Sequence, residues 1–328
     1  MTFLGRLGAG GDRLFATVPG RRARISCPSV GVRRIDGRGR TSERDTSVSG
    51  GRRLVALHEA RTTMNERFHA LRVSEVIVET EDARSLVFDV PDDLTEEFRY
   101  RPGQFLTLHL PGTDRGTVTR CYSLSSSPHT SDPLMVTVKR TPSGRVSDWL
   151  LRSVRPGSVV HVQPPSGRFT PASLDGDFLL LAAGSGITPV ISITKSVLAA
   201  GAGRVTLVYA NRDERSVIFA ERLGRLAAAH PDRFAVVHWL ESLQGLPDAA
   251  RLRTLAEPFR DRDVFVCGPG PFVAGAVGAL ERLGVPRERT HLEEFRPPGG
   301  AGGPDAPAGR GPSAARPACA TRLQAVLP

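Results

Sequence analysis

Between residues 71 and 163 the chain alternates short apolar runs with polar and turn residues. Pairs such as Pro102-Gly103 and Pro156-Gly157 separate the runs. Since side chains point to alternate faces along a strand, this pattern predicts half-buried strands, and many short strands at this spacing are typical of an antiparallel β-barrel or sandwich. We expect strands at residues 71–79, 85–90, 104–110, 119–124, 134–140 and 159–163, and one helix at residues 147–154 with Ser147 as its N-cap.

After a turn at residues 164–167, apolar strands alternate with segments of helical length. This alternation predicts an α/β domain with a doubly wound parallel sheet. We therefore expect a β-barrel domain at residues 64–170 and an α/β domain at residues 171–295. The expected strands of the second domain are residues 178–183, 204–210, 234–240 and 264–267, and its expected helices are residues 189–200, 218–229, 249–255 and 271–283.

The two ends of the chain lack a pattern that could bury one face. Residues 1–63 are rich in Gly, Arg and Ser, and we interpret them as a disordered basic leader, with an organellar transit peptide as the alternative. Residues 296–328 are a low-complexity mixture that predicts a disordered, flexible tail. The longest strongly apolar stretch, residues 178–187, is about half the roughly 20 residues that span a bilayer. We expect a cytoplasmic protein with no membrane partner.

The formal net charge of the chain is +10, but the ends carry it. Residues 1–63 contribute +8 and residues 296–328 contribute +3, which leaves −1 for residues 64–295. Nucleic-acid binding needs Lys and Arg clustered on one folded face, so we expect no nucleic-acid partner. The four cysteines lie far apart without a C-x-x-C pair, and no metal site is indicated.

A cation, an aromatic ring and a hydroxyl group lie together on the fourth predicted strand. Arg120 and Tyr122 are two residues apart and share one face, and Ser123 follows. Arginine binds pyrophosphate through a fork of donors, and tyrosine can cover a flavin ring. The same residues also suit an ordinary half-buried strand. A glycine turn at residues 143–147 then opens the barrel helix and would present free N–H groups to an anion, although this pattern is common.

Two further motifs lie at the ends of strands in the α/β domain. Residues 184–189, Gly-Ser-Gly-Ile-Thr-Pro, follow an apolar strand, and their glycines would let the backbone approach a dinucleotide, with Pro189 at the first helical position. Pro189 stands where the usual fingerprint has its third glycine, and a purely structural turn is the alternative. Cys267 ends the last predicted strand, where α/β proteins bind ligands, but it also suits a small buried apolar position.

Taken in order, R-C-Y-S, S-G-R-V-S, G-S-G-I-T-P, C-G-P and E-E-F resemble the ferredoxin-NADP reductase superfamily. More narrowly, Y-R-P-G-Q-F-L-T-L, R-C-Y-S-L-S-S-S-P-H-T, Y-A-N-R-D-E-R-S-V-I-F and V-V-H-W-L-E-S are similar to the reductase components of 3-ketosteroid 9α-hydroxylases, which serve Rieske oxygenases. The resemblance covers roughly residues 69–295. It implies that the barrel binds FAD and that the α/β domain binds NAD(P).

The resemblance also implies a role for each motif. Arg120 would hold the FAD pyrophosphate, Tyr122 would lie on the isoalloxazine ring, and Ser123 would form a hydrogen bond near flavin N5. Cys267 and Glu294 would join Ser123 near the reacting atoms. The other implied FAD contacts are Lys139, Gly144, Val146, Ser147 and Phe295. The implied nucleotide contacts are Gly184, Ser185, Gly186, Thr188, Pro189, Arg212, Gly268 and Pro269.

The choice between NADH and NADPH depends on the residues after the second strand of the α/β domain. An acid there favours NADH, whereas an arginine accommodates the 2′-phosphate of NADPH. Residues 211–215 offer both, so the residues alone leave the choice open. The resemblance favours NADH, with NADPH possible.

The function that the resemblance implies is electron transfer from NADH through FAD to an iron–sulfur oxygenase or a ferredoxin. Such reductases usually continue into a domain whose four cysteines hold a 2Fe-2S cluster. Only Cys319 follows Phe295, so we expect no such cluster in this chain and interpret the tail as a truncation or a change of reading frame. The alternatives are a stand-alone ferredoxin or flavin reductase and a non-catalytic remnant.

Overall fold

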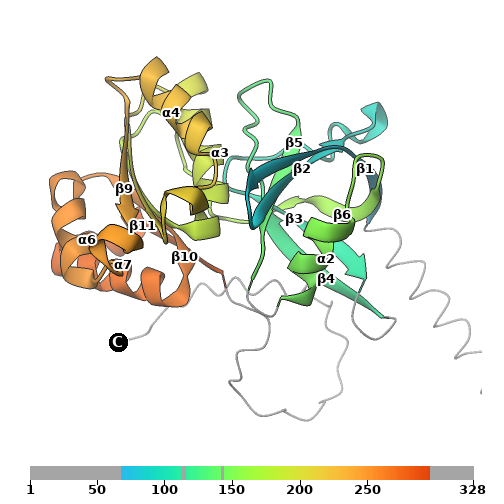
Figure 1. Cartoon of the computed structure of the whole chain (residues 1–328). Helices are drawn as coiled ribbons and strands as arrows, with labels where there is room; N and C mark the ends of the chain where they lie inside the picture. The colour runs from blue at the N-terminus through green and yellow to red at the C-terminus, as the bar shows by residue number, and fades with distance from the viewer. Residues whose placement is uncertain (1–67, 112–115, 142–143, 296–328) are drawn as a thin grey trace, which may run out of the picture. The chain divides into compact units, whose positions relative to one another are not determined.

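The structure is a computed structural model, and it describes residues 68–111, 116–141 and 144–295. The predicted leader and tail, together with residues 64–67, lie outside the described residues. The described chain forms one antiparallel sheet and one parallel sheet (Figure 1). Both sheet types agree with the predicted fold class.

The antiparallel sheet has six strands in the order β4-β3-β6-β1-β2-β5. An isolated antiparallel bridge between Leu124 and Val136 joins the segment after β4 to β5, so the two outer strands meet as in a barrel. Helix α2, Arg145–Ser153, packs Leu150 into the barrel core. The strands are β1 His69–Thr80, β2 Ala83–Asp89, β3 Phe105–Pro111, β4 Thr117–Ser123, β5 Leu134–Lys139 and β6 Val159–Ser166.

The start of α2 differs from the prediction. Its N-cap is Gly144, and Ser147 lies inside the first turn. The Ser147 hydroxyl donates to the carbonyl oxygen of Gly144 at 2.9 Å and accepts from the amide of Thr141 at 3.1 Å. Ser147 therefore closes the turn from within the helix. A Cβ at Gly144 would lie 1.8 Å from Thr141 Oγ1, so packing alone requires glycine there.

The parallel sheet has five strands in the order β11-β10-β7-β8-β9. Along β7, Phe178 and Leu180 pack on the face covered by α3 and α4, whereas Leu179 and Leu181 pack on the face covered by α6 and α7 (Figure 1). The predicted doubly wound arrangement is confirmed. The strands are β7 Phe178–Ala183, β8 Val205–Asn211, β9 Phe234–Leu240, β10 Asp263–Pro269 and β11 Thr290–Phe295; the helices are α3 Ile187–Ala200, α4 Ala220–Ala229, α5 Glu241–Gln244, α6 Ala249–Ala256 and α7 Gly270–Arg282.

Three local features differ from the sequence analysis. Strand β11 was not predicted, because it is short and carries two adjacent acids at its end. Strand β6 extends to Ser166 through residues predicted as a turn. Helix α3 begins at Ile187 after a 3-10 turn, η2 (Gly184–Gly186), so Pro189 is its third residue rather than its first. A proline is tolerated there, because N–H groups in the first turn have no acceptor within the helix.

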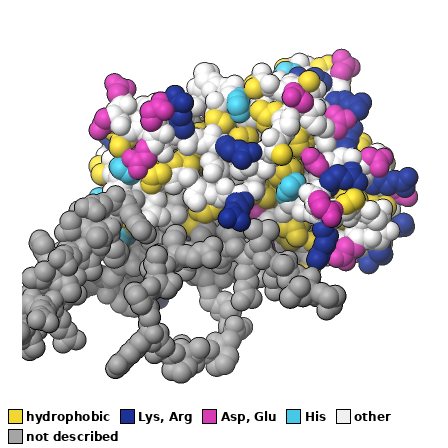
Figure 2. Space-filling view, turned by 180° about the vertical axis from the view of Figure 1, so that it is seen from behind, with side chains coloured by type: hydrophobic (Ala, Val, Ile, Leu, Met, Phe, Trp, Pro, Cys, Tyr) yellow, Lys and Arg dark blue, Asp and Glu magenta, His cyan; other side chains and the backbone are white. Residues whose placement is uncertain are grey.

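Surface charge and hydropathy add little to this picture. On the face shown in Figure 2, the Lys and Arg side chains of the described residues are interspersed with Asp and Glu and form no continuous basic stripe. No helix within the described ranges is long and apolar enough to cross a membrane.

Candidate functional site

The order of the parallel strands places two sequence motifs at one point. Strands β8 and β10 lie on opposite sides of β7, so the carboxyl ends of β7 and β10 form the topological switch point, where open α/β sheets bind ligands. Turn η2 follows β7, and Cys267, Gly268 and Pro269 end β10. A Cβ at Gly186 would lie only 2.1 Å from the carbonyl oxygen of Cys267. The two motifs therefore meet backbone to backbone.

The glycine turn is held in a fixed shape by residues from both sheets. Gly184 has a left-handed φ of 53°, and the buried Tyr209 hydroxyl of β8 donates to its carbonyl oxygen at 3.0 Å. Burial raises the pKa of Tyr209, so the phenol remains a hydrogen-bond donor. From the barrel, Lys139 Nζ lies 3.7 Å from where a Cβ on Gly184 would be. This arrangement suits a backbone that a pyrophosphate approaches closely.

At the carboxyl end of β8, Asn211 is buried beside the Tyr209 hydroxyl, and within the described part of the chain its side-chain amide makes no hydrogen bond of good geometry. Buried amides without partners are rare, because the lost hydration is not replaced. A bound polar ligand at the edge of the sheet would satisfy this amide. The switch point and its neighbourhood thus fit a dinucleotide.

The proposed flavin strand is β4. Tyr122 packs against the barrel core, and burial raises the pKa of its phenol against the opposing effect of the nearby Arg120 charge. Within the described residues Arg120 forms no ion pair, and its side chain donates only to the carbonyl oxygen of Thr119 at 2.8 Å. An aromatic ring beside an uncompensated guanidinium fits a flavin ring with its diphosphate.

The last residue of β4 reaches the parallel sheet. Ser123 Oγ donates to Glu293 Oε1 at 3.0 Å, and both side chains are buried. Burial raises the pKa of Glu293 to about 7, with the Ser123 hydrogen bond opposing the shift. Cys267 lies directly opposite Glu293 in the β10–β11 register, and burial, followed by the Glu293 charge, raises the pKa of its thiol. Strands β4, β10 and β11 thus join in one buried polar site.

The acid in this site is Glu293, which the sequence analysis did not select. Adjacent residues of a strand point to opposite faces, so Glu294 lies on the other face of β11. A Cβ at Gly270 would be 2.8 Å from Glu294 Oε1, which places that carboxyl group at the start of α7. The structure therefore brings Glu293 to Ser123, and it does not bring Glu294 there. Phe295 packs against the core on the α3 side of the sheet.

Two predicted contacts are tied to one acid of the barrel. Arg212 donates to Asp82 Oδ2 at 3.0 Å, and Lys139 Nζ lies 4.0 Å from the same oxygen. Lys139 is thereby placed beside the glycine turn at Gly184, where a nucleotide phosphate would lie, although the resemblance implied an FAD contact.

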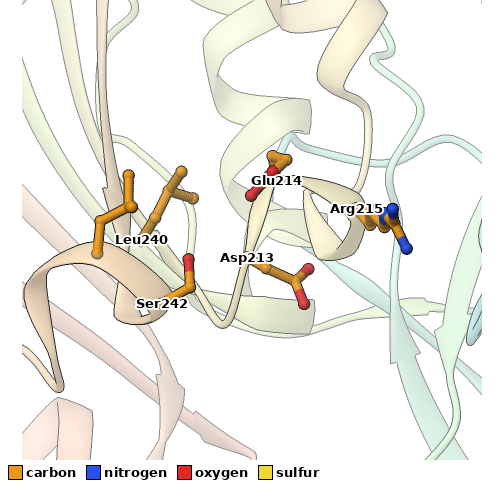
Figure 3. Close-up of a pocket in the computed structure, with 6 residues that line it drawn as sticks. Asp213, Glu214, Arg215, Leu240 and Ser242 are labelled. Carbon is orange, nitrogen blue, oxygen red and sulfur yellow. The ribbon is translucent and has the colours of Figure 1, made fainter.

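A pocket of about 610 Å³ lies at the carboxyl ends of β8 and β9 (Figure 3). Asp213 and Glu214 lie near Leu240 and Ser242, whereas the Arg215 side chain extends away from them. The Asp213 carboxylate accepts from the amide of Ser216 at 2.9 Å and is fixed by that cap. The pocket is lined by Asp213, Glu214, Arg215, Leu240, Ser242 and Leu243.

These features define a class of protein. Among the described residues, no group of three or more His, Cys, Asp and Glu side chains is arranged to hold a metal ion. A barrel strand with Arg120, Tyr122 and Ser123, joined to the switch point of a doubly wound sheet, is the arrangement expected of an oxidoreductase that binds a flavin and a pyridine nucleotide. The chain matches the oxidoreductase FAD-binding domain family over residues 70–170 and the oxidoreductase NAD-binding domain family over residues 180–277. It belongs to the ferredoxin-NADP reductase-type oxidoreductases.

Individual relatives agree with this assignment. The chain is 57% identical over 232 residues to the ferredoxin reductase component of 3-ketosteroid-9-alpha-monooxygenase from Mycobacterium tuberculosis; the match covers 69% of this chain and 65% of the relative's length. It is 32% identical over 241 residues to the reductase subunit of the glycine betaine monooxygenase from Pseudomonas aeruginosa, covering 70% of this chain and 64% of that protein. The FAD/NAD-binding domain of a nitric oxide dioxygenase from Vibrio cholerae has a similar structure, with a TM-score of 0.59, 28% identity, and coverage of 70% of this chain and 100% of that one.

Proposed function

We propose that this protein is the reductase component of a Rieske-type 3-ketosteroid 9α-monooxygenase, which passes electrons from NADH through FAD to an iron–sulfur oxygenase or a ferredoxin. The observation that carries the proposal is the junction of Ser123 on the flavin strand with Glu293 and Cys267 at the nucleotide switch point. The 57% identity to the mycobacterial reductase component supports the steroid assignment.

Binding of FAD is assigned to β4 and to the start of α2. Arg120 would hold the diphosphate through its guanidinium, which forms no ion pair within the described residues, and Tyr122 would cover the ring. The first N–H groups of α2, at Arg145, Val146 and Ser147, have no acceptors within the helix and point to where an anion would bind. When bound, FAD supplies hydride acceptance from nicotinamide and the release of single electrons.

Binding of the nicotinamide nucleotide is assigned to η2 and the end of β10. The backbone of Gly186 lies close against that of Cys267, and Cys267 is fully buried with a raised pKa. Its thiol therefore stays neutral and acts here as a small side chain that leaves room for a ring. Thr188 is held by its hydrogen bond to the carbonyl oxygen of Ser185 at 3.1 Å.

The Ser123–Glu293 pair can hold a proton beside the flavin strand. With a pKa of about 7, the Glu293 carboxyl group changes protonation near neutral pH. Ser123 lies on the strand that carries Tyr122, and its hydroxyl donates a hydrogen bond to Glu293 Oε1, which positions this carboxyl group beside the flavin strand. Both side chains are buried, so little water reaches this pair.

NADH is the proposed donor. Arg212, the cation best placed after β8 to meet a 2′-phosphate, is engaged by Asp82. The carboxylates of Asp213 and Glu214 line the neighbouring pocket, where they would repel a 2′-phosphate and could accept a hydrogen bond from a ribose hydroxyl. A cytoplasmic location goes with this function, because NADH and the oxygenase partner would both be met there.

Steady-state assays of the FAD-loaded protein test the acceptor. We expect NADH-dependent reduction of an isolated 2Fe-2S ferredoxin or of the Rieske oxygenase. Reduction of free flavin without reduction of either iron–sulfur protein would instead identify a stand-alone flavin reductase. No NADH oxidation with any acceptor would identify a non-catalytic remnant.

A further inference from the structure

Helix α3 is buried on nearly all sides although it carries polar residues. Twelve consecutive residues, Ile187–Leu198, are buried. Ile191 and Ile193 belong to the apolar core of the α3 face, while Ser192, Lys195 and Ser196 are also shielded from water. A helix buried all round needs a second neighbour besides the sheet, and its polar groups need partners there.

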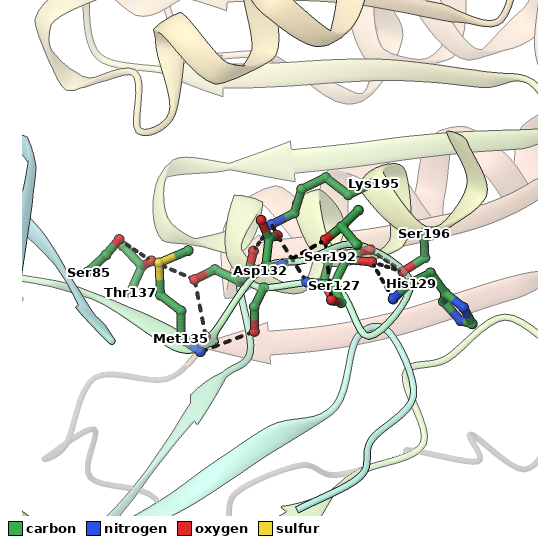
Figure 4. Close-up of polar contacts among 12 residues, drawn as sticks. Ser85, Ser127, His129, Asp132, Met135, Thr137, Ser192, Lys195 and Ser196 are labelled. Carbon is green, nitrogen blue, oxygen red and sulfur yellow. Dashed lines mark hydrogen bonds and ion pairs between the residues drawn. The ribbon is translucent and has the colours of Figure 1, made fainter. Parts of the chain in front are cut away.

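The partners of Lys195 and Ser196 lie in the barrel segment between β4 and β5, whereas the Ser192 hydroxyl has no hydrogen-bond partner within the described residues. The Lys195 side chain is 5% exposed, and its Nζ donates to the carbonyl oxygen of Ser125 at 2.7 Å and to the carboxylate of Asp132 (Figure 4). Ser127 Oγ and Ser196 Oγ are 2.8 Å apart. Because the Ser196 hydroxyl donates to the carbonyl oxygen of Ser192, Ser127 is the donor in that pair.

The same segment is anchored inside the barrel. Ser125 Oγ lies 2.8 Å from Thr137 Oγ1, which in turn lies 2.7 Å from Ser85 Oγ (Figure 4). Tyr100 donates to Ser126 Oγ at 2.7 Å. These contacts connect the segment to β2 and β5, so a shift of the segment would also shift the barrel sheet.

A lysine buried in this way is costly for stability unless it is paired. Removing an ammonium group from water costs several kcal/mol, and replacing buried pairs by apolar residues is often neutral or stabilising. Burial raises the pKa of Asp132, but its hydrogen bond with Lys195 and the Lys195 charge hold that pKa below the usual value. Burial lowers the pKa of Lys195, and the hydrogen bond and charge of Asp132 oppose that shift. The value of the pair lies in fixing one arrangement of the two elements.

We propose that Lys195 and Asp132 form a latch that positions the nucleotide turn against the flavin strand; this rests on the proposed function. Lys195 lies seven residues after Thr188, about 10 Å along α3. The latch's other acceptor, Ser125, lies two residues after Ser123. Lys195 touches neither site and is a positioning residue. A misplacement of about 1 Å between reacting groups can lower a rate about 100-fold.

The test uses Lys195→Met, Asp132→Asn and the double variant, with Arg233→Met as the matched control. Arg233 donates to the carbonyl oxygens of Val197 and Gly201 at the end of α3, so its loss weakens the same helix without breaking a contact to the barrel. The full-length protein is loaded with FAD and mixed anaerobically with saturating NADH. We expect the limiting rate of flavin reduction to fall at least tenfold in both single latch variants, with FAD content unchanged.

The control and the double variant separate a latch from a loss of stability. We expect the double variant to be no slower than the slower single variant, because each substitution removes the same interaction. Arg233→Met should keep the wild-type limiting rate even where its Tm falls. An unchanged rate in Lys195→Met, or an equal fall in Arg233→Met, would overturn the proposal.

Amide hydrogen exchange of the flavin-free protein supplies a readout independent of activity. Residues 125–132 and α3 should exchange faster in both latch variants than in the wild type, and equal exchange would contradict the latch. If Lys195→Met does not fold, the reduction rate and hydrogen exchange of Asp132→Asn test the proposal. The Asp132 side chain is 29% exposed, so its replacement disturbs packing less. A wild-type protein whose flavin is not reduced by NADH would instead refute the proposed function.

Discussion

Glu293 is a carboxyl group whose properties are set by where it is buried. Its pKa rises from 4.5 to about 7, so the folded protein binds a proton there that the unfolded chain has already released. Between those two values, stability falls as pH rises, because the unfolded state holds fewer protons than the folded state. A carboxylate in an ion pair has the opposite effect, because its contribution to stability increases as pH rises.

We predict that Glu293→Gln removes this pH dependence. From pH 4.5 to above 7, the free energy of unfolding of the wild type should fall by about 3 kcal/mol through this group alone. Urea unfolding of both proteins across that range measures the difference. Parallel pH profiles for the two proteins would show that Glu293 is not buried as described.

Single substitutions should distinguish the proposed flavin contacts from the proposed nucleotide contact. Arg120→Ala and Tyr122→Ala should weaken FAD binding about tenfold or more, since a charge-assisted hydrogen bond contributes about 1.5–3 kcal/mol and a stacked aromatic ring adds about 0.5–1.5 kcal/mol beyond the area that it buries. Cys267→Ala should retain FAD, because the nucleotide contacts this residue only transiently. The ratio of flavin to protein after gel filtration measures retention. A normal ratio in Arg120→Ala would remove that residue from the FAD site.

At the scale of elements, the crossing of η2 over β10 is a close backbone contact at the nucleotide part of the site. We predict that Gly186→Ala lowers the free energy of unfolding by about 2 kcal/mol, because the new Cβ meets the Cys267 backbone rather than a flexible side chain. Gly224→Ala in α4 is the matched control, since nothing lies within 4 Å of its Cβ. That change should stabilise the protein by about 0.5–1 kcal/mol. Equal effects of the two substitutions would show that the crossing is not close.

The elements themselves were largely predictable from the sequence. Residues 178–183 and 234–240 form the expected strands with the expected ends, because apolar runs bounded by turns leave little choice. Strand β11 was missed, since its hydrogen bonds to β10 depend on a partner distant in sequence. The N-cap of α2 was misassigned because Ser147 is equally able to bond from inside the first turn.

At the scale of the whole molecule, the sequence placed the expected motifs at strand ends that the structure brings together, but it did not predict which side chains would meet. Which of Glu293 and Glu294 faces Ser123 depends on the register of β11 against β10, and no local sequence pattern predicts that register. Likewise, the sequence does not distinguish Lys195 from an ordinary helix residue, because its partner Asp132 lies far away in the chain. Contacts between segments far apart in the chain decide both cases.

Nucleotide preference also depends on a contact between the barrel and the parallel sheet. We predict at least a tenfold preference for NADH in kcat/KM. Asp82→Ala should narrow that preference, because Arg212 would be released to meet a 2′-phosphate. Comparing both nucleotides at equal concentrations measures the ratio. A wild-type preference of tenfold or more for NADPH would contradict the assignment.

The central claim is that this chain binds FAD in its barrel and brings a nicotinamide nucleotide to it. The most direct measurement is an anaerobic titration of the FAD-loaded full-length protein with NADH, followed by visible absorption. We predict that one equivalent of NADH bleaches the flavin band completely. A flavin band that persists at excess NADH, or a protein that takes up no FAD, would contradict it.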